Sequence, residues 1–192
     1  MATMTMDRPE GTWSITTRTI VYAAIGAALY AVFNWISFGF LLPGTNEVNI
    51  RPHYGLLTFF GFAFGPVVGF LTGFVGNVVG DQLTGWGAFT SPHWSLANGV
   101  AGLLAGLLPA WMASRMSSTG SKAVTAAIVA VIATVLGFLL VFLGLILTPE
   151  MGFNTILTTE YIPTIIANSI AAAVVTPILV LAWEPLREQI GR

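Results

Sequence analysis

Long apolar runs, separated by short polar segments, dominate the pattern of residues along this chain. Four runs are long enough to cross a membrane as helices, namely Ile20–Leu42, Trp94–Met112, Ala123–Leu147 and Tyr161–Trp183. The apolar region 54–79 does not fit one ordinary span, and Gly65-Pro66 lies inside it. Because proline disrupts the helical hydrogen bonds just before it, we expect two helices here, Pro52–Phe64 and Pro66–Gly80. The first is short and extended by the preceding loop, so the pattern predicts six spans.

The composition indicates a membrane protein. Charged residues make up 8% of the 192 residues and apolar residues 55%, whereas about 25% charged residues is typical of soluble domains. A soluble core of this size could not bury so much apolar side chain, so we expect an all-α protein with several spans. The net charge of −1 gives no indication of nucleic-acid binding. The chain contains no cysteine, which excludes disulfides and thiolate chemistry.

The distribution of lysine and arginine tests the six-span arrangement, because these residues concentrate on the cytoplasmic side of membranes. With six spans and a cytoplasmic N-terminus, only Arg51 lies outside, whereas a five-span model leaves two basic residues outside. The residues inside are Arg8, Arg18, Arg115, Lys122, Arg187 and Arg192. We therefore expect a multi-pass protein of the cell membrane with both termini in the cytoplasm. It would consist of a cytoplasmic segment 1–19, a six-helix transmembrane domain 20–185 and a cytoplasmic tail 186–192.

Polar side chains within the spans gather near the outer face under this topology. Asn77 and Asp81 lie four residues apart on one face of the third span. The sixth span carries a stripe of the same spacing, Glu160, Thr164 and Asn168. Polar groups inside a membrane are energetically costly and are usually functional or paired with one another. Together with the apolar and aromatic residues around them, these side chains predict an outward-facing binding pocket closed by the outer loops.

The residues that we expect to bind a substrate come from several spans and from the two first outer loops. They are Asn34, Asn49, Arg51, Asn77, Asp81, Trp86, Trp94, Asn98 and Asn168. Each asparagine has an alternative role, since it could hydrogen-bond between helices and only brace the bundle. Asp81 and Glu160 could equally lie in water at helix ends, and the two tryptophans could belong to the aromatic belt of the membrane interface. His53 and His93 could suggest a metal, but no tight cluster of metal ligands supports one, and we expect none.

Small residues mark the inner halves of two spans. Gly65, Gly69 and Gly73 belong to the third span, and Gly102 and Gly106 to the fourth. Small residues at this spacing let helix backbones approach closely, so we expect the interior to be closed below the polar layer. This argues against a channel or a proton relay and predicts a cup open to the outside. The fifth span has only threonines as polar residues, so we expect it to face lipid on most sides and not to build the pocket.

Alanine recurs at every fourth position of the first span, in the stretch "AAIGAALYA". Ala23, Ala27 and Ala31 form one smooth helix face, and Ala24 and Ala28 lie beside them. A face of this kind is typical of close helix packing, because small residues let another helix approach. The neighbour could be a helix of the same chain or a helix of a partner protein.

This stretch, together with "NEVNIRPHY", "FGPVVGFLTGFVGNVVGD" and "WSLANGVAGLLAGLLPA", resembles the S components of energy-coupling factor (ECF) transporters over residues 15–185. These are small six-span proteins of prokaryotic membranes that bind vitamins and related micronutrients. The resemblance implies the substrate-specific binding subunit of an ECF-type ABC importer in the cytoplasmic membrane. It further implies a water-soluble vitamin or related micronutrient as substrate, with riboflavin-type members in the branch that looks closest. Ala23, Ala27 and Ala31 would dock against the T component.

The resemblance also implies a T component and two ATPase subunits as partners, which would supply the energy for uptake. The residues agree with an external energy source, because the chain contains no G-x-x-x-x-G-K-[ST] loop. No cofactor is expected, and the N-terminal segment lacks the histidines of the nickel and cobalt branch. Two other functions stay open. One is an integral membrane enzyme that uses Asp81 or Glu160 as acid or base on a lipid-soluble substrate, and the other is a structural membrane subunit.

Overall fold

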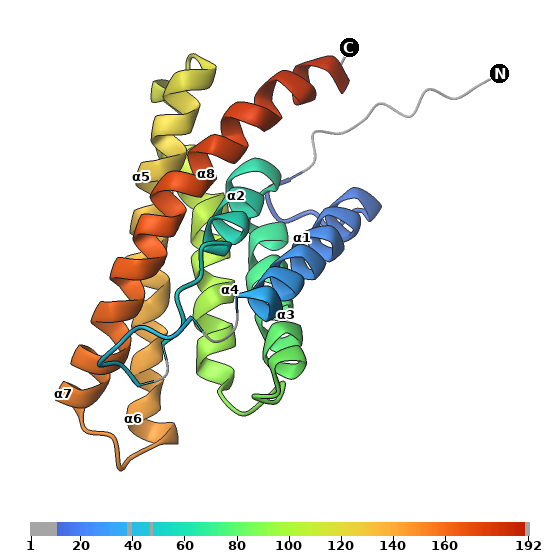
Figure 1. The fold of residues 1–192 in the computed structure, drawn as a ribbon. Helices are drawn as coiled ribbons and strands as arrows, with labels where there is room; N and C mark the ends of the chain where they lie inside the picture. Colours follow the sequence, from blue (N-terminus) through green and yellow to red (C-terminus); the bar gives the residue numbers. More distant parts are fainter. Residues whose placement is uncertain (1–10, 38–39, 47, 191–192) are drawn as a thin grey trace.

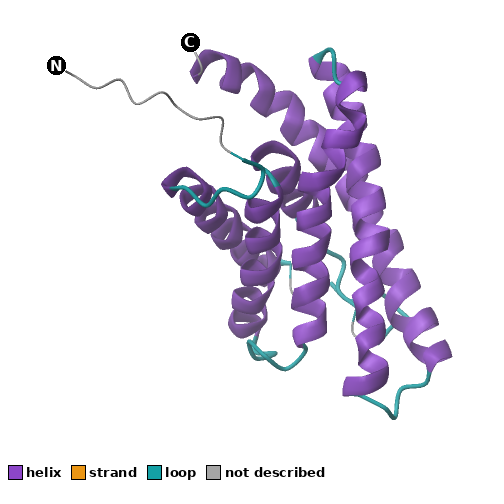
Figure 2. Ribbon diagram, turned by 180° about the vertical axis from the view of Figure 1, so that it is seen from behind, coloured by secondary structure: helices purple, strands orange, loops and turns teal. Residues whose placement is uncertain are grey.

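The computed structural model describes residues 11–37, 40–46 and 48–190 and is built from helices joined by loops (Figures 1 and 2). Its six longer helices are α1 (Thr17–Ile36), α2 (Tyr54–Phe64), α3 (Pro66–Thr84), α4 (Pro92–Leu107), α5 (Thr119–Gly137) and α8 (Ile162–Ile190). Shorter pieces are the 3₁₀ segments η1 (Leu108–Arg115) and η2 (Phe138–Leu143), α6 (Gly144–Leu147), α7 (Phe153–Thr155) and the π-helix η3 (Ile156–Tyr161). Arg8 and Arg192, two of the basic residues used above, lie outside the described ranges.

The helices are arranged around α2. α1 packs on α3, α3 on α4, and α5 on α8. α2 is the shortest of the six, yet it contacts α1, α3, α4, α5 and α8. The start of α1 and the end of α8 lie at one end of the bundle, and the loops that follow α3 and α6 lie at the other (Figure 1). The bundle therefore has a terminal end and a loop end, and these two names are kept below.

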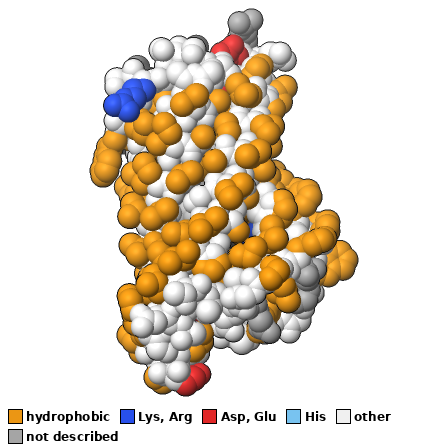
Figure 3. Space-filling view, turned by 60° about the vertical axis from the view of Figure 1, so that its left-hand side comes forward, with side chains coloured by type: hydrophobic (Ala, Val, Ile, Leu, Met, Phe, Trp, Pro, Cys, Tyr) orange, Lys and Arg blue, Asp and Glu red, His pale blue; other side chains and the backbone are white. Residues whose placement is uncertain are grey.

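An apolar outer surface identifies the fold as that of a helical membrane protein. Four segments of the described residues are long and apolar enough to cross a membrane: Thr17–Ile36, Pro92–Arg115, Thr119–Leu147 and Phe153–Gln189. Exposed apolar side chains recur every fourth residue along α8, at Ile162, Ile166 and Ile170, and such side chains cover the middle of the molecule (Figure 3). A soluble monomer rarely exposes so large an apolar patch, whereas lipid covers it without cost.

The expectation that the fifth span faces lipid on most sides is wrong. In Thr119–Leu147, 44% of the residues in the most apolar stretch are buried, against 22% in Phe153–Gln189. Ala126, Ala130 and Phe138 are fully buried, in a segment that packs against α4 and α8. Composition alone could not show this, because a face that packs on another helix is as apolar as a face that meets lipid.

The break between α2 and α3 falls at Gly65-Pro66, as predicted. Gly65 has a φ of +97°, a conformation that glycine adopts readily, and Pro66 begins α3, where its missing N–H costs no helical hydrogen bond. A Cβ on Gly106 of α4 would lie 2.6 Å from the carbonyl carbon of Gly65, so the start of α3 lies close to the α4 backbone, as the glycine spacing predicts. With 11 residues, α2 is roughly 16 Å long, about half the apolar thickness of a bilayer.

Backbone pairing ends α1 earlier than the apolar pattern predicts, at Ile36 instead of Leu42. The N–H of Leu42 donates to the carbonyl of Val48 (2.8 Å). The N–H of Ile50 donates to the carbonyl of Phe40 (2.7 Å). Residues 40–42 thus leave the helix and pair with the following loop.

Glycines bring α3 and α4 into backbone contact, as their spacing predicts. A Cβ on Gly69 would lie 2.1 Å from the carbonyl oxygen of Gly102. A Cβ on Gly73 would lie 2.3 Å from the carbonyl oxygen of Asn98. A larger residue at these positions would hold the two helices apart, so the glycines set the distance at which all other side chains of α3 and α4 meet.

The face formed by Ala23, Ala27 and Ala31 packs inside the bundle. Their exposed fractions are 4%, 7% and 1%, because α1 lies directly on α3. Of the two neighbours left open by the sequence, the structure shows a helix of the same chain. The expectation that these three residues form a partner-docking surface is therefore wrong for this arrangement. Ala24 and Ala28, on the adjacent face of α1, are exposed.

Candidate functional site

A cavity of about 230 Å³ opens at the loop end of the bundle. Its walls come from four regions: the loop before α2, the end of α3 with the loop to α4, the start of α4, and the region from α6 to α8. The lining residues are Asn46, Val48, Asn49, Arg51, Asp81, Trp86, Gly87, Thr90, Ser91, His93, Trp94, Thr148, Met151, Glu160, Thr164 and Asn168. Aromatic rings combined with a few polar groups are typical of a pocket for a small molecule.

One wall of the cavity is the polar stripe of η3 and α8. Glu160, Thr164 and Asn168 are buried and line the cavity together. The Glu160 carboxylate accepts a hydrogen bond from the side-chain amide of Asn46 (2.7 Å). The backbone N–H of Asn46 donates to the carbonyl of Thr159 (3.1 Å). These two bonds hold the loop before α2 against the stripe, so loop and stripe form one continuous surface.

A buried hydrogen-bond network centred on Asn77 supports the opposite side of the cavity. The Asn77 side-chain oxygen accepts from Arg51 Nη1 (2.9 Å) and from Asn98 Nδ2 (3.3 Å). Its amide nitrogen donates to Asp81 Oδ2 (2.7 Å) and to Ser95 Oγ (3.0 Å). An amide side chain has two donor hydrogens and an oxygen with two lone pairs, so all four capacities of Asn77 are used. Asn77 is fully buried and joins α3, α4 and the loop before α2.

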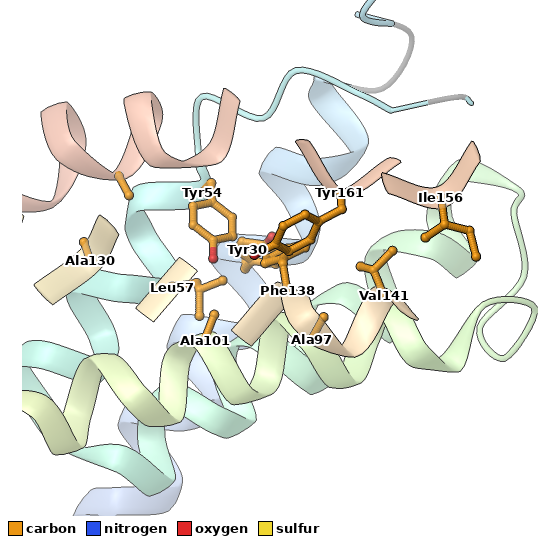
Figure 4. Close-up of a cluster of buried hydrophobic side chains, with 11 residues drawn as sticks. Tyr30, Tyr54, Leu57, Ala97, Ala101, Ala130, Phe138, Val141, Ile156 and Tyr161 are labelled. Atoms are coloured by element: carbon orange, nitrogen blue, oxygen red, sulfur yellow. The ribbon is translucent and has the colours of Figure 1, made fainter. Parts of the chain in front are cut away.

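Asn98 extends this network to α1. Its side-chain oxygen accepts from the hydroxyl of Tyr30 (2.8 Å), and its amide donates to the backbone carbonyl of Trp94 (2.8 Å) as well as to Asn77. Tyr30 belongs to a cluster of buried apolar and aromatic side chains that also contains Tyr54 (Figure 4). The network therefore connects the cavity wall to the apolar core of the bundle.

The structure brings six of the nine predicted binding residues to the cavity. These are Asn49, Arg51, Asp81, Trp86, Trp94 and Asn168. Asn34, Asn77 and Asn98 are buried but are not among the lining residues. Asn34 instead packs closely against Gly80 of α3, where an added Cβ would lie 2.3 Å from Asn34 Nδ2. For these three asparagines the geometry agrees with the alternative role, which is to brace the bundle.

The loop that follows α6 was not among the predicted parts of the pocket. Thr148 and Met151 from this loop line the cavity, because the chain turns back here through a bond from the Met151 N–H to the Thr148 carbonyl (2.9 Å). A signal was available, since a six-span topology places this short loop at the same face as the other two. Glu160 and Thr164 were recognised as part of the polar stripe but not counted among the binding residues.

Some polar groups of the cavity have no partner within the protein. In the described part of the chain, Thr164 Oγ1 and His93 Nδ1 are buried without a hydrogen-bond partner, and no lysine or arginine forms an ion pair with Glu160. Burying such groups unpaired is energetically costly, so they are suited to receive hydrogen-bond donors from a ligand. The described residues contain no group of three or more His, Asp or Glu placed to hold a metal ion.

Comparisons with known proteins indicate a family. A model of the family described as "ECF-type riboflavin transporter, S component" matches residues 14–184. A UPF0397 protein of Aliivibrio fischeri (strain MJ11) is 36% identical over 91 residues, 47% of this chain and 48% of that protein. A UPF0397 protein of Streptococcus gordonii is 37% identical over 93 residues, 47% of this chain and 46% of that protein. The chain spans about half the length of the curated relatives it matches, and no solved structure matches it.

The Asn77 network yields a prediction for stability. Asn77→Leu leaves Arg51 and Asp81 without a shared partner, and each unsatisfied buried group should cost roughly 1–3 kcal/mol. Tyr30→Phe removes a single hydroxyl and should cost about 1 kcal/mol. Thermal unfolding in detergent measures both changes, and Asn154→Leu, at an exposed asparagine, is the control. An Asn77→Leu variant as stable as the wild type would contradict the bracing role.

Proposed function

Because the chain belongs to the family of ECF-type riboflavin transporter S components, we propose that it captures a water-soluble vitamin or related micronutrient at the extracellular face for ATP-driven uptake. S components are substrate-binding subunits of transporters and not enzymes, which excludes the membrane enzyme considered above. In this proposal a T component and two ATPase subunits supply the energy. Riboflavin is the substrate that the family description names, and it is the first compound to test.

The cavity at the loop end supports this proposal most directly. We propose that the substrate lies between the tryptophans Trp86 and Trp94 on one side and the stripe of Glu160, Thr164 and Asn168 on the other. The tryptophans offer stacking surfaces for a flat ring system. The stripe offers a carboxylate, a hydroxyl and an amide, so a substrate that presents N–H or cationic donors toward Glu160 would satisfy it. In this proposal Asn77 and Asn98 position Arg51, Asp81 and the start of α4, and like Asn34 they do not contact the substrate.

Glu160 provides the sharpest test of substrate binding. Mass spectrometry of small molecules that co-purify with the protein, expressed in rich medium, identifies the ligand, and titration then measures its affinity. Glu160→Leu removes a charged acceptor worth about 1.5–3 kcal/mol, so the affinity should fall by roughly ten- to a hundredfold. Glu150→Gln, at an exposed carboxylate outside the cavity, should leave it unchanged. If no compound co-purifies and riboflavin does not bind, the structural-subunit alternative is favoured.

The proposed orientation places the loop end outside and both termini in the cytoplasm, with segments 1–19 and 186–192 flanking a six-span domain 20–185. The concentration of basic residues toward the terminal end supports it. The wild-type chain has no cysteine, so single cysteines report their own accessibility. In intact cells, an impermeant thiol reagent should label Glu150→Cys and not Ser117→Cys. The reverse labelling would mean that the cavity opens to the cytoplasm.

The exposed alanines of α1 are the proposed contact with the T component. Ala24 and Ala28 are four residues apart and exposed, so a partner helix could approach α1 closely there. The double variant Ala24→Leu/Ala28→Leu should keep its thermal stability and substrate binding, because added apolar bulk faces lipid, but should lose uptake in cells and co-purification with a T component. Ala27→Leu, inside the bundle, should instead destabilise the isolated protein. Undiminished uptake by the double variant would exclude this surface.

A further inference from the structure

A second cavity, of about 250 Å³, lies at the terminal end of the bundle. α1 contributes Arg18 and Tyr22, α2 contributes Phe64, and α8 contributes Trp183 and Arg187. The cavity is separate from the substrate cavity, with which it shares no lining residue. Two arginines from opposite ends of the sequence meet here around an aromatic wall, and neither the family description nor the proposed substrate site accounts for this arrangement.

The aromatic wall joins the three helices. The rings of Tyr22 and Phe64 are stacked with their centroids 4.2 Å apart, and Phe64 meets Trp183 edge to face at 5.1 Å. The indole N–H of Trp183 is buried and has no hydrogen-bond partner in the described part of the chain. Tyrosine and tryptophan concentrate at the level of lipid headgroups, where an apolar ring and a polar atom are both accommodated. The wall thus contains the residue types that are typical of a membrane interface, and one of them, Trp183, has an indole N–H without a hydrogen-bond partner among the described residues.

Among the described residues that line this cavity, the charged ones are the two arginines. The Arg18 guanidinium lies 5.8 Å from the centre of the Tyr22 ring. Arg187 pairs with Glu184 (3.2 Å), and Lys122 of α5 pairs with the same carboxylate. Glu184 is therefore shared by two cations, which leaves positive charge on the cavity side. In the described part of α8, one acidic residue follows Glu184, the exposed Glu188.

We propose that this cavity binds the phosphate of an anionic phospholipid headgroup. Arg18 and Arg187 would supply charge-assisted hydrogen bonds to the phosphate oxygens, for which the guanidinium fork is well suited, and the Trp183 indole would supply a further donor. Basic pockets between membrane helices at the cytoplasmic side are a common form of headgroup site. The neighbouring exposed residues Ile20 and Leu186 are apolar and suited to acyl chains. The assignment does not depend on the substrate.

Nanodiscs of phosphatidylcholine, with or without phosphatidylglycerol, provide the test with the full chain. Native mass spectrometry should detect phosphatidylglycerol retained by the wild type, and its melting temperature should rise when this lipid is present. Arg18→Gln and Arg187→Gln should each lower retention by about tenfold or more and reduce the rise. Arg115→Gln removes an exposed arginine that does not line the cavity and should behave as the wild type, which separates a site from general surface charge.

Three results would overturn the proposal. Equal retention by the wild type and by both cavity variants would mean that no headgroup binds there. An equal loss in Arg115→Gln would mean that surface charge alone attracts the lipid. An equal rise in melting temperature from inorganic phosphate in pure phosphatidylcholine discs would assign the site to free phosphate instead of a lipid. Each variant's melting temperature without phosphatidylglycerol reports whether it is folded, so a misfolded variant can mimic neither the expected loss of retention nor the second result.

Discussion

The side-chain amide of Asn77 is the junction on which the binding end of the molecule depends. It contacts Arg51 and Asp81, which line the cavity at the loop end, and Asn98, which connects to α1. These amides meet only because Gly69 and Gly73 let α3 approach the backbone of α4. The close helix contact and the polar network are thus one structural unit. In lipid, where hiding apolar area gives helices no reason to associate, packing contact and hydrogen bonds of this kind hold them together.

Much of the helical arrangement could be predicted from local chemistry. Gly65-Pro66 divides one apolar region into two helices, because the glycine adopts a conformation that other residues disfavour and the proline begins a helix well. The glycine spacing predicted the α3–α4 contact for an equally local reason. Which neighbour a given helix face packs on could not be predicted in the same way. Ala23 and Ala24 are adjacent and chemically identical, yet one packs on α3 and the other is exposed, and only the path of the whole chain decides between them.

For the candidate site, the sequence predicts that polar residues gather at one depth of the bundle. It does not predict which atoms each of them contacts. Spacing of four showed that Asn77, Asn98 and Asn168 point toward the interior, and all three are buried. Whether such a residue faces the cavity or a neighbouring helix depends on backbone distances of a few ångströms, which spacing does not encode. Asn168 lines the cavity, whereas Asn77 spends all its hydrogen bonds on the protein. Loops were harder still, because Thr148 enters the wall through a turn and not through a periodic pattern.

The π-helix η3 has a consequence for how relatives of this protein are compared. Its hydrogen bonds reach back five residues instead of four, so each of its turns holds more residues than an α-helical turn. Glu160 lies in η3, and Thr164 follows in α8. Removing one residue upstream of α8 would turn everything before it by about 100° around the helix axis. A one-residue gap in an alignment near positions 156–161 would therefore mark a change in which side chain faces the cavity, even where every aligned residue is identical.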